Sequence, residues 1–211
     1  LFNRFPDVAW MLCVAQFGSH HQVGDYSHKP TWRPDGYGHG EPFPTWGPVL
    51  EFAEKMIELA LSRARYTVSM LSDLIDRVHD LTDADQDRVW ALVEAWLQTA
   101  SDNDKITLRE KIRVSTLSRR AALRGKKSSK QARLVTAGKR IHAALEPSNL
   151  LDKHAWLFKG TWIDESADEL EDIQNIDYEE RENRIRKQRT DALKEIHGQY
   201  GIAGLLNTAI R

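Results

Sequence analysis

Basic side chains are concentrated in one stretch of this chain. Residues 105–140 hold thirteen Lys or Arg against one acid, Glu110. Within it, cations crowd a Gly-Ser turn, where flexible positive side chains and backbone amides could meet phosphate groups. These cations are Arg119, Arg120, Arg124, Lys126, Lys127, Lys130 and Arg133. The pattern indicates a nucleic-acid-binding surface as one hypothesis.

An acidic stretch offers another explanation for the same charges. Residues 161–182 hold ten Asp or Glu against one base, Arg181, and the whole chain has a formal charge of −1. A phosphate-binding face usually leaves its whole domain basic. We therefore favour the hypothesis that the basic and acidic stretches face each other and neutralise internally.

Histidines are the second group of side chains that could do chemistry. His20, His21, His28 and His39 fall in one proline-rich loop, and imidazole is a common zinc ligand. They have no cysteine partner and no regular spacing, so we expect hydrogen-bonding roles and no metal site. The chain also lacks a phosphate-binding G-x-x-x-x-G-K-[ST] loop, a G-x-S-x-G elbow and an H-E-x-x-H pair. We expect no catalytic residue and no cofactor.

The loop itself, residues 19–47, is the best candidate for a binding surface. Its prolines and glycines forbid a long helix, and its aromatic side chains argue against disorder, so we expect it to pack on neighbouring helices. A long aromatic loop mounted on rigid helices is a common way to present a binding site. The candidate ligand- or partner-binding residues are Tyr26, His28, Lys29, Trp32 and Arg33.

The elements that would position these residues are helices. In residues 70–97, apolar side chains recur at i, i+3, i+4 and i+7 on both sides of Thr82, which predicts a helical hairpin. Similar patterns predict helices over 6–17, 48–62, 101–125, 129–145 and 176–197. The expected fold is all-α, with antiparallel hairpins stacked as a HEAT-like or irregular helical-repeat array of about forty residues per repeat.

We expect a single helical domain over residues 1–211, as a fragment of a longer chain. It would comprise the loop 19–47, helical hairpins over 48–146 and a charged helical part over 148–211. No segment approaches the roughly 20 apolar residues of a membrane span, and no signal-like segment is seen, so a cytoplasmic location is expected. The one cysteine, Cys13, falls in an apolar run and is predicted to be buried.

Several segments resemble stretches of known proteins. RFPDVAW (4–10), YSHKPTWR (26–33), KHAWLF (153–158) and DYEERE (177–182) resemble helical, HEAT-like C-terminal regions of large, mostly uncharacterised bacterial proteins, some suspected of roles in phage defence. The resemblance implies a non-catalytic scaffold or sensor region whose partners are other domains of the parent chain or another protein. It transfers no active-site residue. The alternative function is nucleic-acid binding by the basic turn.

Overall fold

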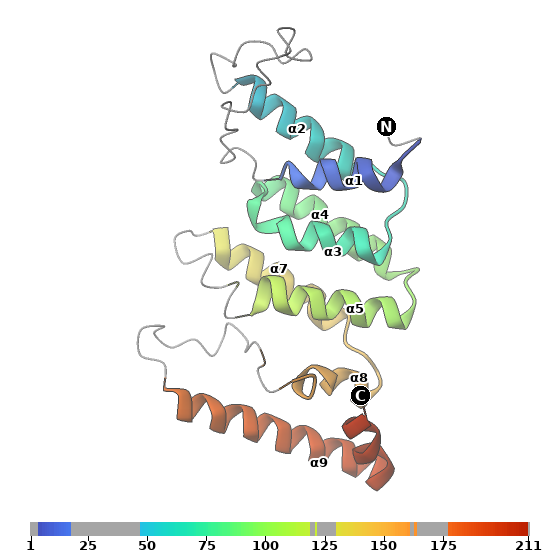
Figure 1. Ribbon diagram of the computed structural model, residues 1–211, viewed down its shortest axis with the longest axis vertical. Helices are drawn as coiled ribbons and strands as arrows, with labels where there is room; N and C mark the ends of the chain where they lie inside the picture. The colour runs from blue at the N-terminus through green and yellow to red at the C-terminus, as the bar shows by residue number, and fades with distance from the viewer. Residues whose placement is uncertain are drawn as a thin grey trace, which may run out of the picture. The chain divides into compact units, whose positions relative to one another are not determined.

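The computed structural model describes residues 4–17, 47–118, 121, 130–160, 163 and 177–210. Every element in this described part is a helix, which confirms the all-α prediction (Figure 1). The chain divides into two compact units, Leu1–Tyr66 with Asp80–Thr82 and Thr67–His79 with Asp83–Arg211. None of the described helices combines the length and the apolar character that a bilayer crossing needs.

The first unit is built on helices α1 (Pro6–Ala15) and α2 (Gly47–Leu61), which pack against each other. Pro6 occupies the first turn of α1, where its missing amide proton would have no partner. Cys13 is buried, as predicted, and its Sγ lies 3.8 Å from Sδ of Met56 on α2. The ring of Trp10 meets that of Tyr66 edge-on at 6.4 Å.

The second unit begins with the predicted helical hairpin. Its first elements are α3 (Val68–Arg77), the 3-10 turn η4 (Val78–Asp80), α4 (Asp83–Leu97), α5 (Asp102–Ile112) and the π-helical turn η5 (Arg113–Leu117). The hydroxyls of Thr67 and Ser101 accept hydrogen bonds from the first-turn amides of α3 and α5. The apolar stripes face inward, since Leu74 and Val89 are fully buried. The periodicity of 70–97 thus predicted both helices correctly.

The remaining elements of the second unit are α7 (Lys130–Ala144), α8 (Leu150–His154), the 3-10 turn η6 (Ala155–Leu157) and α9 (Tyr178–Ile210). Helix α7 packs on α4, α5 and η5, whereas α8 and η6 pack on α9 (Figure 1). The latter contact has a small apolar core of its own, formed by Leu157, Ile163, Ile185 and Ala192, with Trp156 and Phe158 packed against it.

Two boundaries differ from those the sequence predicts. The helix expected to run from 101 to 125 leaves α geometry at Arg113, where η5 begins. Glycines 198 and 201 were expected to end the last long helix, yet only Gly201, with φ of 63°, has non-helical backbone angles. A glycine inside a helix lowers helix stability by only about 1 kcal/mol relative to alanine, so the neighbouring turns can keep such a residue helical. The chain therefore passes Gly198 as helix and kinks at Gly201.

Candidate functional site

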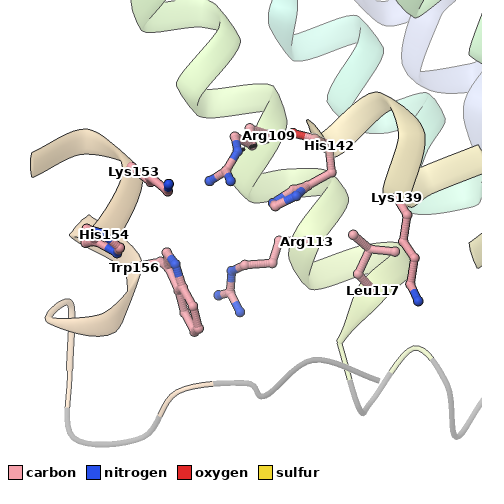
Figure 2. Close-up of a pocket in the computed structure, with 8 residues that line it drawn as sticks. All are labelled: Arg109, Arg113, Leu117, Lys139, His142, Lys153, His154 and Trp156. Atoms are coloured by element: carbon pink, nitrogen blue, oxygen red, sulfur yellow. Dashed lines mark hydrogen bonds between the residues drawn. The ribbon is translucent and has the colours of Figure 1, made fainter. Parts of the chain in front are cut away.

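A cationic pocket lies in the second unit, between α5 with η5, α7, and α8 with η6 (Figure 2). Its volume is about 370 Å³. Most of its side chains are cations or imidazoles, and the full lining is Arg109, Arg113, Leu117, Lys139, His142, Lys153, His154 and Trp156. Such a concentration of positive charge in one concave site is the feature that most resembles a ligand site in the described residues.

Helix α5 contributes Arg109, and Arg113 is the first residue of η5, which continues the helix. The two arginines are four residues apart, so they project from about the same face. The π-helical turn η5 ends at Leu117 on the pocket lining. A π turn inserts an extra residue into a helix and re-aims the side chains that follow it. Here it coincides with the pocket.

Helix α7 supplies His142 and Lys139, and a glycine lets it approach closely. A Cβ built on Gly138 would lie 2.7 Å from Cγ2 of Thr116 and 3.3 Å from Cδ2 of Leu117. A residue without a side chain fits that space, so the backbone of α7 packs directly against the side chains of Thr116 and Leu117 in η5. His142 follows Gly138 by one helical turn, which brings its ring to the pocket.

The third side of the pocket is the short segment α8 and η6, which carries Lys153, His154 and Trp156. A five-residue helix is marginal alone, and α9 supports it. Arg189 of α9 donates from Nε to the Leu157 carbonyl at 2.8 Å and from Nη2 to the Gly160 carbonyl at 2.7 Å. His154 Nε2 lies 2.8 Å from Oε2 of Glu195, also on α9.

Two of the pocket cations already have acidic partners. Arg113 donates to both carboxylate oxygens of Glu110, at 2.8 and 2.9 Å, and its guanidinium stacks 4.4 Å from the ring centre of Trp156. Lys153 Nζ lies 2.6 Å from Oε1 of Glu146. This hydrogen bond lowers the pKa of Glu146 and raises that of Lys153, so both groups are charged near neutral pH.

Arg109, also in the pocket lining, forms no ion pair with a described residue. Its Nε donates to the backbone carbonyl of His142 at 3.3 Å, and its terminal Nη atoms form no hydrogen bond with described residues. Burial lowers the pKa of Arg109, because the charged guanidinium loses hydration there. Guanidinium groups remain protonated in proteins. The pocket therefore contains a partly desolvated positive charge whose Nη donors are not used by any residue that the structure describes.

His142 lies beside these arginines and is neutral at pH 7. Its pKa is lowered to about 4, mainly by burial and in addition by the nearby charges of Arg109 and Arg113. Its Nε2 is buried and has no hydrogen-bond partner among the described residues. An anion in the pocket could accept hydrogen bonds from the Nη atoms of Arg109. Its negative charge would offset the repulsion from the arginines that disfavours the imidazolium form of His142.

The residues predicted from sequence as sites fall largely elsewhere. Outside the described residues are Tyr26, His28, Lys29, Trp32, Arg33, Arg119, Arg120, Arg124, Lys126 and Lys127. Lys130 begins α7, and the structure does not describe its side chain. The aromatic loop and most of the basic turn thus stay predictions.

Arg133, the last of the predicted nucleic-acid contacts, is engaged within the protein. It forms ion pairs with Asp83 and Asp87 of α4, and Arg140, two turns further along α7, pairs with Glu94. Two described acids of 161–182 pair along their own helix instead, Glu180 with Arg184 and Glu182 with Arg186. For these described cations, neutralisation comes from α4 and not from the acidic stretch.

Sequence reasoning missed the pocket. Arg109 and Arg113 were counted within the basic stretch but not singled out, and Lys153, His154 and Trp156 were considered only as part of the segment 153–158. The available signal was the i, i+4 arginine pair on one helix face together with the Lys153-His154 pair. Nothing in the sequence places these two pairs side by side.

Among the described residues, no group of three His, Cys, Asp or Glu side chains could hold a metal ion. The four loop histidines lie outside this part of the chain. No family model, curated protein or solved structure matches this chain. The pocket geometry therefore carries the functional argument by itself.

Proposed function

We propose that this chain is a helical recognition segment, a scaffold or sensor within a larger protein, that binds a negatively charged small molecule in the cationic pocket. Its helices would stack as a HEAT-like or irregular array, with the pocket in the second unit. The observation that carries the proposal is Arg109, whose Nη atoms have no hydrogen-bond partner among the described residues and whose charge is partly buried.

Electrostatics support a missing anionic partner. A buried charge is costly unless it is paired and hydrogen-bonded. Glu110 bonds to Arg113 and Glu146 bonds to Lys153, so the nearest carboxylates are already used. A bound anion would supply Arg109 with the acceptor that the protein does not provide among its described residues.

The size of the pocket supports a small ligand. Small-molecule sites typically enclose about 300 to 1,000 Å³, and this one has about 370 Å³. Nucleic acids, in contrast, are usually bound over an extended cationic surface that follows many phosphates. Arg133 and Arg140 on α7 form ion pairs with acids of α4, so they contribute less positive charge to any surface that could bind phosphates.

The test compares two charge-removing variants of the full chain. Arg109→Gln removes the free guanidinium, and Arg186→Gln removes an exposed arginine of α9 outside the pocket lining. Calorimetry with inorganic phosphate, citrate and a nucleoside monophosphate should detect binding to the unmodified chain and to Arg186→Gln. Binding should weaken at least tenfold in Arg109→Gln, since a charge-assisted hydrogen bond contributes about 1.5 to 3 kcal/mol.

The alternative, nucleic-acid binding by the basic turn, predicts a different result. Affinity for an oligonucleotide would fall steeply with salt, with a slope of about −0.9 per phosphate contact on duplex DNA. It would not depend on Arg109. Tight, salt-sensitive oligonucleotide binding that is equal in both variants, without binding of the small anions, would replace the pocket proposal with this one.

A further inference from the structure

We infer that the ligand group recognised in this pocket is a phosphate monoester dianion, held by Arg109 and Lys153 and charge-matched by proton uptake at His142. This inference rests on the proposed function and specifies its ligand. Three features of the pocket lead to it: the donor geometry, the number of positive charges that can face the ligand, and the apolar part of the lining.

The donors suit a tetrahedral oxyanion. The Nη atoms of Arg109 form a planar fork that matches two oxygens of a phosphate or carboxylate. Lys153 has three N–H donors and gives one to Glu146, so two remain for a ligand. Figure 2 shows Lys153 reaching the pocket from α8, on the opposite side from Arg109 on α5. Donors on two sides fit an anion with oxygens pointing in several directions better than a planar carboxylate.

The second negative charge is matched at His142. Arg113 and Lys153 are already compensated by Glu110 and Glu146, and Lys139 also interacts within the protein, so Arg109 is the lining cation that has no acidic partner among the described residues. The imidazole of His142 is neutral when the pocket is empty, and its buried Nε2 has no partner. A dianion would offset the repulsion from the two arginines and favour the imidazolium. The ring would then supply the second charge.

The charged surroundings of this ring come from every element that forms the pocket. Arg109, Glu110 and Arg113 belong to α5 and η5, and Glu146 follows α7. The cations Lys139 of α7 and Lys153 of α8, with the imidazole of His154, complete the lining. Burial first, and then the excess of cations over carboxylates, disfavours the charged ring, and an entering anion would offset the second of these effects.

The apolar lining indicates an ester over free phosphate. Leu117 and Trp156 border the same cavity, and the stacked Arg113 guanidinium fixes the orientation of the indole. These surfaces would bury an organic substituent, which inorganic phosphate lacks. A pocket of about 370 Å³ is also larger than one phosphate group needs.

The test is calorimetry on the full chain at pH 7.0, in two buffers that differ in ionisation enthalpy. The probes are phenyl phosphate, inorganic phosphate, diphenyl phosphate and benzoate. Phenyl phosphate should bind at least tenfold more tightly than the other three, with net proton uptake. In His142→Gln the proton uptake should disappear and affinity should fall. The matched control is His197→Gln, an exposed histidine of α9, which should behave as the unmodified chain.

The outcomes separate this inference from the proposed function. If benzoate or diphenyl phosphate binds as tightly as phenyl phosphate and still depends on Arg109, the pocket is an anion site but not a phosphate monoester site. Proton uptake that is unchanged in His142→Gln would also overturn the inference. Failure of every anion to bind at millimolar concentration would overturn the inference and the proposed function together.

Discussion

Gly138 of α7 approaches Thr116 so closely that a Cβ on the glycine would lie 2.7 Å from the threonine Cγ2. This contact sets the position of α7 against η5 and, one turn later, that of His142. Gly138→Ala should therefore destabilise the protein by about 1 to 3 kcal/mol, the usual cost of an overpacked contact. It should also weaken anion binding. Denaturant unfolding and calorimetry would measure the two effects.

Gly198→Ala is the matched control, because a Cβ there meets nothing within 4 Å. Alanine is a better helix former than glycine, so this variant should be more stable by about 0.5 to 1 kcal/mol. If Gly138→Ala stabilises the protein as Gly198→Ala does, α7 and η5 do not pack as closely at Gly138 as described here.

Stability should depend on pH through His142. Its pKa is about 4 in the folded protein against an ordinary value of 6.5, so the unfolded chain binds the extra proton between these values. The stabilising effect of the neutral ring is fully present above pH 6.5 and is lost as the pH falls toward 4. Allowing for solvent screening of a partly exposed ring, the loss from pH 7.5 to 5.0 should be about 1 kcal/mol.

The measurement is the free energy of unfolding at both pH values, for the unmodified chain and for His142→Gln. The variant should lose less stability on acidification, while His197→Gln should follow the unmodified chain. An identical pH dependence in all three proteins would show that His142 is not held neutral by its surroundings.

Arg189 should control the order of the segment that carries Lys153 and Trp156. Arg189→Met removes the hydrogen bonds to the carbonyls of Leu157 and Gly160. Amide hydrogen exchange over residues 150–160 should accelerate, by an amount corresponding to about 2 kcal/mol. The exposed pair of Arg186 with Glu182 contributes little, so Arg186→Met should leave exchange in this segment unchanged.

Cys13 should react slowly with thiol reagents. Its side chain is 3% exposed, and burial raises the pKa of the thiol, so labelling requires opening of the α1 and α2 contact. We expect the native rate to be about 100-fold or more below that in denaturant. Met56→Ala removes the neighbour of the thiol and should accelerate labelling, whereas replacement of the exposed Met11 by alanine should not.

Local patterns predicted the helices well. The stripe through Leu71, Leu74 and Ile75 gave α3 its buried face, and Ser101 caps α5 as its sequence position indicates. These features depend on residues within one or two turns, which a sequence displays directly. The π turn at Arg113 was not predicted, because it depends on how η5 packs against α3, α5 and α7.

The pocket could not be predicted in the same way. Arg109 and Lys153 line one pocket although they are 44 residues apart in the sequence, and their relative position depends on Gly138 and on the hydrogen bonds from Arg189. The basic stretch illustrates the same limit. Its charge was evident, but the sequence did not show that Arg133 would pair with Asp87 or that Arg109 would form no ion pair with the described residues.

The hydrogen bonds from Arg189 have a consequence for signalling. They join the segment that carries Lys153 and Trp156 to a helix that begins at Tyr178. If the pocket binds an anion as proposed, an occupied pocket and an intact α9 favour each other thermodynamically. By thermodynamic reciprocity, a partner that binds and stabilises α9 would then also raise the affinity of the pocket for its ligand. Anion binding in the pocket could in this way change the stability of α9 without any rearrangement of α5 or α7.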